Sequence, residues 1–494
     1  MRSERLENAH TAGVKGVSTL KLSVFVQDLA TVSVGTLLAT ILGILQVFII
    51  PRIVTVETFG YWRLFLLYNS FAGLLHLGFA DGALLRWAGR EFYDIRPEVP
   101  SSLKFLGCQQ LAILPCLGLI VITALPLRLR AVGVGLLVFA AVFNVTALLQ
   151  YSLQAARQFK LVAVASTLPM GVFVLLAVLW TRVATPNVSI LIALFIVGWS
   201  CVLIVYWIRI RPFSHKESVS ASVIGRRLLA LGWPIALSNT VYGLIQTVDR
   251  LAVSSIFSIN EFAQYSFAAS ALFIPITAIT AGSQVFFPHI AAVEEGNRTK
   301  AYSSGSLLLV IAWGLSLPYY FILQIFVRNF LPKYEPGLPA AMVLMFSVLF
   351  LGGIQILQGS FFNIYGLQRS FLKSSIAALL VGLCLVLAAA LRFKSLTVIA
   401  IAQVLTLALW WQFNEWKLKE VTGQSIRDWV RTACLFSWSG LSFWAAASVS
   451  SKAVVRVGFL YVLLAIGITL IHPRGLLVAR LTLLRKLRQA ESTR

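Results

Sequence analysis

The sequence predicts an all-α integral membrane protein with about fourteen transmembrane helices. Of the 494 residues, 59% are hydrophobic and only 12% are charged, and the mean hydropathy is +0.85. Apolar runs long enough to span a bilayer recur along the whole chain, a pattern that soluble proteins do not show. These observations exclude an ordinary soluble enzyme or binding domain.

The distribution of positive charge predicts the orientation of the chain. The net charge is +23. If the N-terminus lies in the cytoplasm, the inner segments hold 29 of the 41 Lys and Arg residues and the outer segments hold 12. Because cytoplasmic loops carry the excess of Lys and Arg, we expect both termini to be cytoplasmic. The charge is then explained by orientation and by contact with anionic lipid, and no nucleic-acid partner is expected.

The span count and two similar turns predict a duplicated chain. Glu57 and Tyr61 follow the first span, and they match Glu261 and Tyr265 at an offset of 204 residues. Two halves that begin on the same side of the membrane indicate a parallel repeat. The predicted segments are a cytoplasmic lead (1–26), a first six-helix bundle (27–209), a cytoplasmic linker (210–227), a second six-helix bundle (228–417), helices 13 and 14 (418–472) and a basic cytoplasmic tail (473–494).

Two apolar runs between Arg226 and Ile290 each carry polar residues at helical spacing, with a short polar turn between the runs. The polar positions are Asn239, Tyr242, Gln246 and Asp249 on the first run, and Ser266, Ser270, Thr277 and Gln284 on the second. Each set lies on one face of a helix. Polar side chains in a membrane helix are expected to face the bundle interior or a water-filled cavity. We therefore predict a helical hairpin that lines a polar path.

The candidate site residues fall into three chemical groups. Guanidinium groups suit a diphosphate or an acidic sugar, whereas uncharged amides suit sugar hydroxyls. A carboxylate or a histidine in a polar cavity can bind a coupling ion. The candidates are Arg86 and Arg250 for the anionic part of a substrate, Gln46, Asn69, Asn239, Gln246 and Gln284 for hydroxyls, and Asp81, Asp249 and His76 for H⁺ or Na⁺.

Each of these candidates also has a structural interpretation, and the sequence leaves both open. Asp81 with Arg86, and Asp249 with Arg250, lie near helix ends and can pair locally. His76 can be a buried histidine with its hydrogen bonds satisfied. The amides can form hydrogen bonds between helices.

Several catalytic motifs are missing from the sequence. It contains no P-loop, HExxH, GxSxG or paired-cysteine motif, so we expect no cofactor, no metal site and no enzymatic activity. The five cysteines lie within apolar runs and are predicted to be buried small side chains. The longest predicted outer loop has about a dozen residues (327–338), too few for the catalytic loop of a membrane glycan polymerase. A protein that moves its substrate fits these features better.

Short motifs along nearly the whole chain resemble one transporter family. They are Glu57-x-Phe59-Gly60-Tyr61, Leu77-Gly78-Phe79 followed by Arg86, then Pro234, Asp249, Tyr265, Phe287-Pro288, and the turn Tyr365-Gly366-Leu367-Gln368-Arg369. The chain resembles the polysaccharide repeat-unit flippases (Wzx type) of the multidrug/oligosaccharidyl-lipid/polysaccharide exporter superfamily. It departs from that pattern at His76, where an acidic residue is common, so an ionic role there does not carry over.

The resemblance implies both an architecture and an activity. Two six-helix bundles would form a V-shaped cavity lined by spans one, two, seven and eight, and two extra C-terminal helices would add a lipid-facing groove. The substrate would be an undecaprenyl-diphosphate-linked oligosaccharide, an O-antigen or exopolysaccharide unit, flipped across the bacterial cytoplasmic (inner) membrane. Alternating access driven by H⁺ or Na⁺ is expected, with a polysaccharide polymerase and export machinery as partners. A cation-coupled multidrug exporter, a lipid II flippase and a glycan polymerase remain alternatives.

Overall fold

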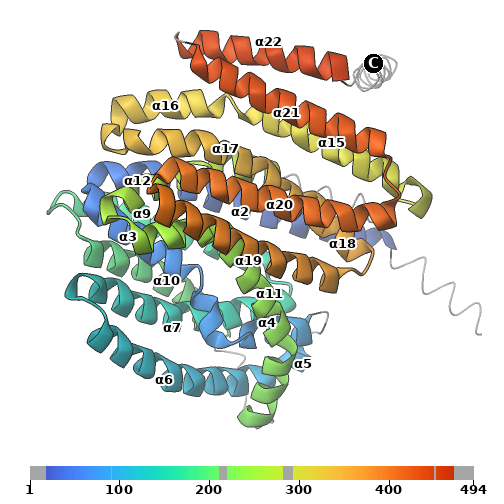
Figure 1. Cartoon of the computed structure of the whole chain (residues 1–494). Helices are drawn as coiled ribbons and strands as arrows, with labels where there is room; N and C mark the ends of the chain where they lie inside the picture. The colour runs from blue at the N-terminus through green and yellow to red at the C-terminus, as the bar shows by residue number, and fades with distance from the viewer. Residues whose placement is uncertain are drawn as a thin grey trace, which may run out of the picture. The chain divides into compact units, whose positions relative to one another are not determined.

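The computed structural model describes residues 18–88, 90, 92–210, 220–281, 293–449 and 452–471. All regular secondary structure within these ranges is helical (Figure 1). The chain divides into two compact units, Met1–Gly243 and Leu244–Arg494. The long helix α11 (Ala221–Ile256) begins in the first unit and ends in the second.

The first unit contains, before α11, α2 (Ser18–Ile53), α3 (Val56–Asn69), η1 (Ala72–His76), α4 (Phe79–Trp87), α5 (Phe92–Ile95), α6 (Glu98–Ala124), α7 (Leu127–Ala155), α8 (Phe159–Ala165), α9 (Leu168–Trp180) and α10 (Val188–Ile210). The second unit contains, after α11, α12 (Ile259–Ala271), α13 (Phe273–Ala281), η3 (Glu295–Asn297), α15 (Arg298–Ser316), α16 (Tyr319–Phe330), η4 (Pro332–Gly337), α17 (Leu338–Gly353), the π-helical turn η5 (Ile354–Gln358), α18 (Gly359–Ile364), α19 (Gln368–Phe393), α20 (Leu396–Thr422), α21 (Ile426–Ser448) and α22 (Ala453–Ile471). In this unit α19 packs along α20, and α21 along α22 (Figure 1).

The prediction of a multi-pass, all-helical membrane protein is confirmed. Among the described residues, ten helices are long and apolar enough to cross a membrane, and an eleventh span results if the bent pair Val56–His76 and Phe79–Trp87 counts as one. Helices α2, α12, α13 and α21 are outside this set. The count of fourteen therefore stays a prediction.

The hairpin of α2 and α3 and the hairpin of α11 and α12 are separated by a constant number of residues. Helix α2 ends at Ile53 and α11 ends at Ile256, which is 203 residues later. The next helices, α3 and α12, begin at Val56 and Ile259, again 203 residues apart. The constant interval supports the predicted repeat of this part of the chain.

The caps of α3 and α12 correct the sequence alignment by one residue. The Thr55 side chain accepts from the amide of Thr58, and Ser258 forms a capping box with Glu261. Such caps satisfy amide groups that have no partner in the first helical turn. Aligned at these caps, the offset is 203 rather than 204. Tyr265 then corresponds to Trp62, and both are fully buried.

In the first unit, a sharp bend separates α3 and η1 from α4. The chain bends by 61° between them, where Leu77 and Gly78 have φ angles of 51° and 82°. Glycine tolerates this left-handed conformation without strain. Gly78 and Gly82 also contact the backbone of α11 at Gly232 and Leu228, with no room for a Cβ atom. This close crossing resembles the small-residue contacts that hold membrane helices together.

Packing elsewhere in the first unit is dominated by aromatic rings. The ring centroid of Trp62 lies 4.9 Å from that of Phe173, nearly parallel to it, and 5.5 Å from that of Phe195 in an edge contact. Such pairs add stability beyond simple burial. Thus α3, α9 and α10 are joined by apolar contacts at the position where the second unit carries a tyrosine.

Two expectations about smaller features need correction. Cys108, Cys116, Cys384 and Cys434 are exposed on the surface of the protein and Cys201 is half-buried, because their apolar runs contribute lipid-facing as well as core positions. The predicted linker 210–227 is also partly helical, since α10 ends at Ile210 and α11 begins at Ala221. The intervening residues 211–219 are outside the described ranges.

Candidate functional site

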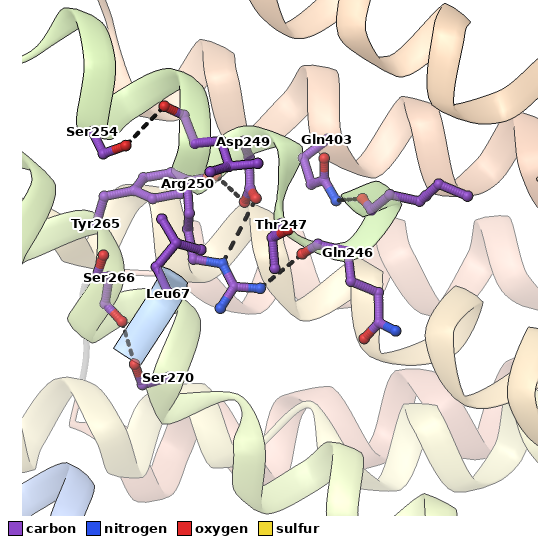
Figure 2. Close-up of polar contacts among 12 residues, drawn as sticks. Leu67, Gln246, Thr247, Asp249, Arg250, Ser254, Tyr265, Ser266, Ser270 and Gln403 are labelled. Atoms are coloured by element: carbon purple, nitrogen blue, oxygen red, sulfur yellow. Dashed lines mark hydrogen bonds and ion pairs between the residues drawn. The ribbon is translucent and has the colours of Figure 1, made fainter. Parts of the chain in front are cut away.

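In the second unit, Asp249 is the buried acidic group of the predicted hairpin. It lies on α11 with only 2% of its surface exposed. The Tyr265 hydroxyl on α12 donates a hydrogen bond of 2.7 Å to Asp249 Oδ2 (Figure 2). Asp249 Oδ1 has no hydrogen-bond partner among the described residues. A carboxylate buried in this way is costly unless it is paired.

Arg250 supplies the charge partner of Asp249, but at the long distance of 3.8 Å between Nε and Oδ1. Its Nη2 donates instead to the main-chain oxygen of Gln246, one turn earlier, at 2.7 Å. Figure 2 shows the guanidinium between these two groups. Arg250 Nε makes no hydrogen bond to a described residue. The local pairing considered from the sequence is therefore real but incomplete, and Arg250 retains N–H donors for another anion.

Helix α20 reaches the same part of α11. Gln403 donates from Nε2 to the main-chain oxygen of Ile245 at 2.9 Å, while its Oε1 has no partner among the described residues. The side chain of Gln246 is half-buried on α11 and points away from the Arg250 guanidinium in Figure 2. The site thus offers an acid, a guanidinium and an amide within two turns of α11 and on its neighbours.

In the first unit, Arg86 pairs with Glu98 rather than with Asp81. Arg86 Nε and Nη2 donate to the two carboxylate oxygens of Glu98 at 2.8 and 2.7 Å. Trp87 Nε1 donates to Glu98 Oε2 at 3.0 Å, and Arg90 Nη1 lies 3.4 Å from Oε1. The cluster has two guanidinium groups on one carboxylate, so a net positive charge remains.

The structure does not join the remaining first-unit candidates to this cluster. His76 is buried, and its Nδ1 accepts from the Gly78 amide at 3.1 Å, which accounts for it as a residue that stabilises the helix break. Asp81 is half-buried on α4. Gln46 is buried on α2, and Asn69, half-buried, has a buried Oδ1 without a hydrogen-bond partner among the described residues.

Two other candidates have different outcomes. Asn239 lies on α11 and is exposed, so it is available to a ligand but has no packing role. Gln284 and the motif Phe287-Pro288 lie outside the described residues. Within those residues, no group of three or more His, Cys, Asp or Glu side chains could hold a metal ion.

Sequence reasoning missed two buried carboxylates, Glu98 and Glu415. Glu98 is the first residue of α6 and is only 6% exposed. Glu415 lies near the end of α20, where Tyr302 from α15 donates to its Oε1 at 2.7 Å. An acidic residue next to the apolar pattern of α20 was the only available signal, because its partner is more than 100 residues away in the chain.

Comparison with known proteins identifies the fold. One solved structure with a similar fold is a lipid II flippase, MurJ, in an inward closed conformation. Its TM-score is 0.70 at 12% sequence identity, over 90% of this chain and 99% of that one. The chain has the fold of the multidrug/oligosaccharidyl-lipid/polysaccharide exporter superfamily. An inward-facing multidrug resistance MATE transporter of this superfamily matches with a TM-score of 0.57 at 13% identity, over 79% of this chain and 96% of the transporter.

Comparison of sequences matches a smaller part of the chain than comparison of structures. A family model described as polysaccharide biosynthesis protein matches residues 124–332, and the sequence matches no curated protein. The exporter resemblance expected from short motifs is confirmed at the level of the fold. Together, the comparisons show the fold of the chain and a match of its middle part to a polysaccharide biosynthesis family model.

Proposed function

We propose that the protein flips undecaprenyl-diphosphate-linked oligosaccharide repeat units from the inner to the outer leaflet of a bacterial cytoplasmic membrane. Two findings together support this proposal. A polysaccharide biosynthesis family model matches residues 124–332, and 90% of the chain aligns with the fold of a lipid II flippase. The product would enter surface polysaccharide synthesis. Both termini would be cytoplasmic, as the distribution of Lys and Arg predicts.

In this proposal the diphosphate is bound by guanidinium groups. Arg250 Nε lies 3.8 Å from its acid and makes no hydrogen bond to a described residue, so the guanidinium can form short, paired hydrogen bonds to phosphate oxygens. Arg86 is held in place by Glu98 and contributes positive charge. Gln246, Asn239, Asn69 and Gln46 are the candidates for sugar hydroxyls, and Gln284 remains a candidate outside the described ranges.

The same proposal assigns the coupling ion to Asp249. While Asp249 is charged, it attracts the guanidinium of Arg250. A proton or Na⁺ on the free Oδ1 would remove that attraction, and Arg250 would be released toward the substrate. Binding of ion and substrate would then be linked, as alternating access driven by a cation gradient requires.

The experiment is transport in proteoliposomes with a labelled polyprenyl-diphosphate oligosaccharide and an impermeant probe of leaflet exposure. Wild-type protein should expose the lipid. Arg250→Ala should lower the rate at least tenfold, the effect of about 1.4 kcal/mol on a binding step. Arg86→Ala should have a similar effect on transport. Arg328→Ala is the matched control, because Arg328 is exposed and pairs with Glu335.

A multidrug exporter is the second candidate, because MATE transporters share the fold. The higher TM-score of the flippase favours the first proposal. If several lipid-linked glycans are not exposed by the protein, while cells that express it export ethidium, the flippase proposal is wrong and the exporter replaces it.

A further inference from the structure

A cavity lined only by residues of the second unit lies apart from the Asp249 site. It has a volume of about 210 Å³ and lies between α15, α17, α20 and α21. Apolar side chains, including Leu349, Phe350, Trp411 and Phe436, form most of its wall. This space accommodates several water molecules or a small organic group, and it is much larger than a bare metal ion requires.

The polar part of the wall presents hydrogen-bond acceptors. Glu415 and Gln424 both line the cavity and are each only 6% exposed. Glu415 Oε1 accepts from Tyr302, but Glu415 Oε2 and Gln424 Oε1 have no hydrogen-bond partner among the described residues. Leaving such atoms buried and unpaired is unfavourable, and more so for a charged group.

Gln358 is a further polar neighbour of the Glu415 carboxylate. Its Nε2 also donates to the Trp411 main-chain oxygen at 3.1 Å, and its Oε1 accepts from Asn414 at 3.0 Å. The protein therefore fixes the carboxylate in place while supplying few donors to it. A ligand with several N–H donors and a positive charge would complete the site.

A second depression near the end of α20 shares Gln412, Glu415 and Trp429 with this cavity. That depression is lined by Glu415, Trp416, Lys419, Ile426 and Trp429, together with Gln412. Lys419 is one helical turn from Glu415, about 5–6 Å between their Cβ atoms. It is exposed and forms no ion pair with a described residue. The opening therefore combines a lysine with exposed apolar side chains.

The residues around the opening indicate the depth of this site in the bilayer. Trp416 is 72% exposed and Trp429 is 38% exposed, and exposed tryptophans of this kind concentrate at the membrane–water interface. Lys417 and Arg427 lie beside them in the sequence. In the predicted orientation this is the cytoplasmic side, so the opening would face lipid headgroups of the inner leaflet.

We propose that this cavity binds the headgroup of an aminophospholipid from the inner leaflet. The ammonium group donates to Glu415 Oε2 and Gln424 Oε1, and the lipid phosphate pairs with Lys419. The acyl chains leave past Ile426 and Trp416. A diphosphate could not occupy the inner part of the cavity favourably, because it would meet the Glu415 carboxylate. The bound lipid is therefore distinct from the flipped substrate.

Native mass spectrometry of the full-length protein in detergent tests this proposal. Dioleoyl-phosphatidylethanolamine, -phosphatidylcholine and -phosphatidylglycerol would be added in equal amounts. The wild type should retain one phosphatidylethanolamine, at least fivefold in preference to either other lipid. Glu415→Gln should reduce that retention about tenfold, the equivalent of about 1.4 kcal/mol. Glu420→Gln, on the same helix but exposed and paired with Lys417, should not change it.

Lys419→Glu provides a second variant at an exposed position, in case Glu415→Gln is not monodisperse on size exclusion. It should also reduce retention of phosphatidylethanolamine, because it opposes the lipid phosphate. Equal retention by the wild type and both variants would overturn the proposal. Equal retention of all three lipids would also overturn it, because the site would then not recognise the ammonium group.

Discussion

The hairpin of α2 and α3 and the hairpin of α11 and α12 are related by one constant offset in sequence but differ in chemistry. At the cap-aligned offset of 203, Trp62 corresponds to Tyr265, and Gln46 corresponds to Asp249. Trp62 stacks on other aromatic rings, whereas Tyr265 donates to Asp249. A carboxylate is therefore not needed to form this hairpin. The hydrogen-bonded acid is a feature of the second hairpin that the first hairpin lacks.

The two units also satisfy their buried carboxylates to different degrees. Glu98 in the first unit accepts from Arg86, Trp87 and Arg90. Asp249 in the second unit accepts from Tyr265 and has its arginine only at 3.8 Å. Glu98 is therefore arranged as a structural anchor, whereas Asp249 is left able to exchange its partner.

The largest effect is expected when the carboxylate of the second hairpin is copied into the first. Gln46→Asp buries a charge at the position that corresponds to Asp249, where residue 62 offers no hydroxyl. The free energy of unfolding should fall by roughly 3–5 kcal/mol. Thermal unfolding in detergent would measure this, with Gln46→Asn as the uncharged control. Equal stability of the two variants would show that the first hairpin can also accept a charge.

A smaller loss is expected when Glu98 is removed. Glu98→Ala leaves two arginines and the Trp87 indole without their acceptor, and partial exposure of the arginines limits the cost to about 2–3 kcal/mol. Chemical or thermal unfolding would report it. Asp94→Ala is the matched control, because Asp94 is a nearby exposed acid. If both variants unfold alike, Glu98 is not the anchor of the first-unit cluster.

Tyr265→Phe should have a moderate effect and decides between the two alignments. It removes the donor to Asp249, which should cost about 1.5–3 kcal/mol for a hydrogen bond to a charged group. Tyr61 is the residue that an offset of 204 would pair with Tyr265, but it is only half-buried. Tyr61→Phe should therefore be nearly neutral in the same unfolding measurement. Comparable losses in both would support the offset of 204 instead.

The smallest perturbation tests whether the two hairpins are parallel repeats. Glu57 and Asn260 correspond at the offset of 203, and both are exposed. In a variant whose five cysteines are replaced by alanine, Glu57→Cys and Asn260→Cys should both react with an impermeant maleimide added outside intact cells. Stability should not change in either. Labelling of only one position would contradict a parallel arrangement.

The sequence predicted the fold class because periodic apolar runs and turn signals are local. The hairpin turn before α12 is an example, since Ser258 and Glu261 lie three residues apart and form a cap that can be read directly. The alignment of the repeats was wrong by one residue, because matching Tyr61 with Tyr265 ignored where each helix begins. Only the caps at Thr55 and Ser258 fixed that register.

The candidate sites were harder to predict because their partners are set by tertiary packing. Asp249 and Arg250 were identified from their charge within an apolar run. Neither Tyr265 as the donor to Asp249 nor Glu98 as the partner of Arg86 could be derived, since each depends on how two helices cross. The Tyr302–Glu415 contact joins residues 113 positions apart, which no local pattern records.

The glycine crossing between α4 and α11 has a consequence for expression in fragments. A cut between α10 and α11 would divide the two bundles predicted from the sequence. A fragment that ends at Ile210, however, would lack the helix that covers the backbone of Gly78 and Gly82. The separately produced halves should therefore depend on each other for insertion and survival, and a fragment that extends through Gly243 should persist better against membrane proteases.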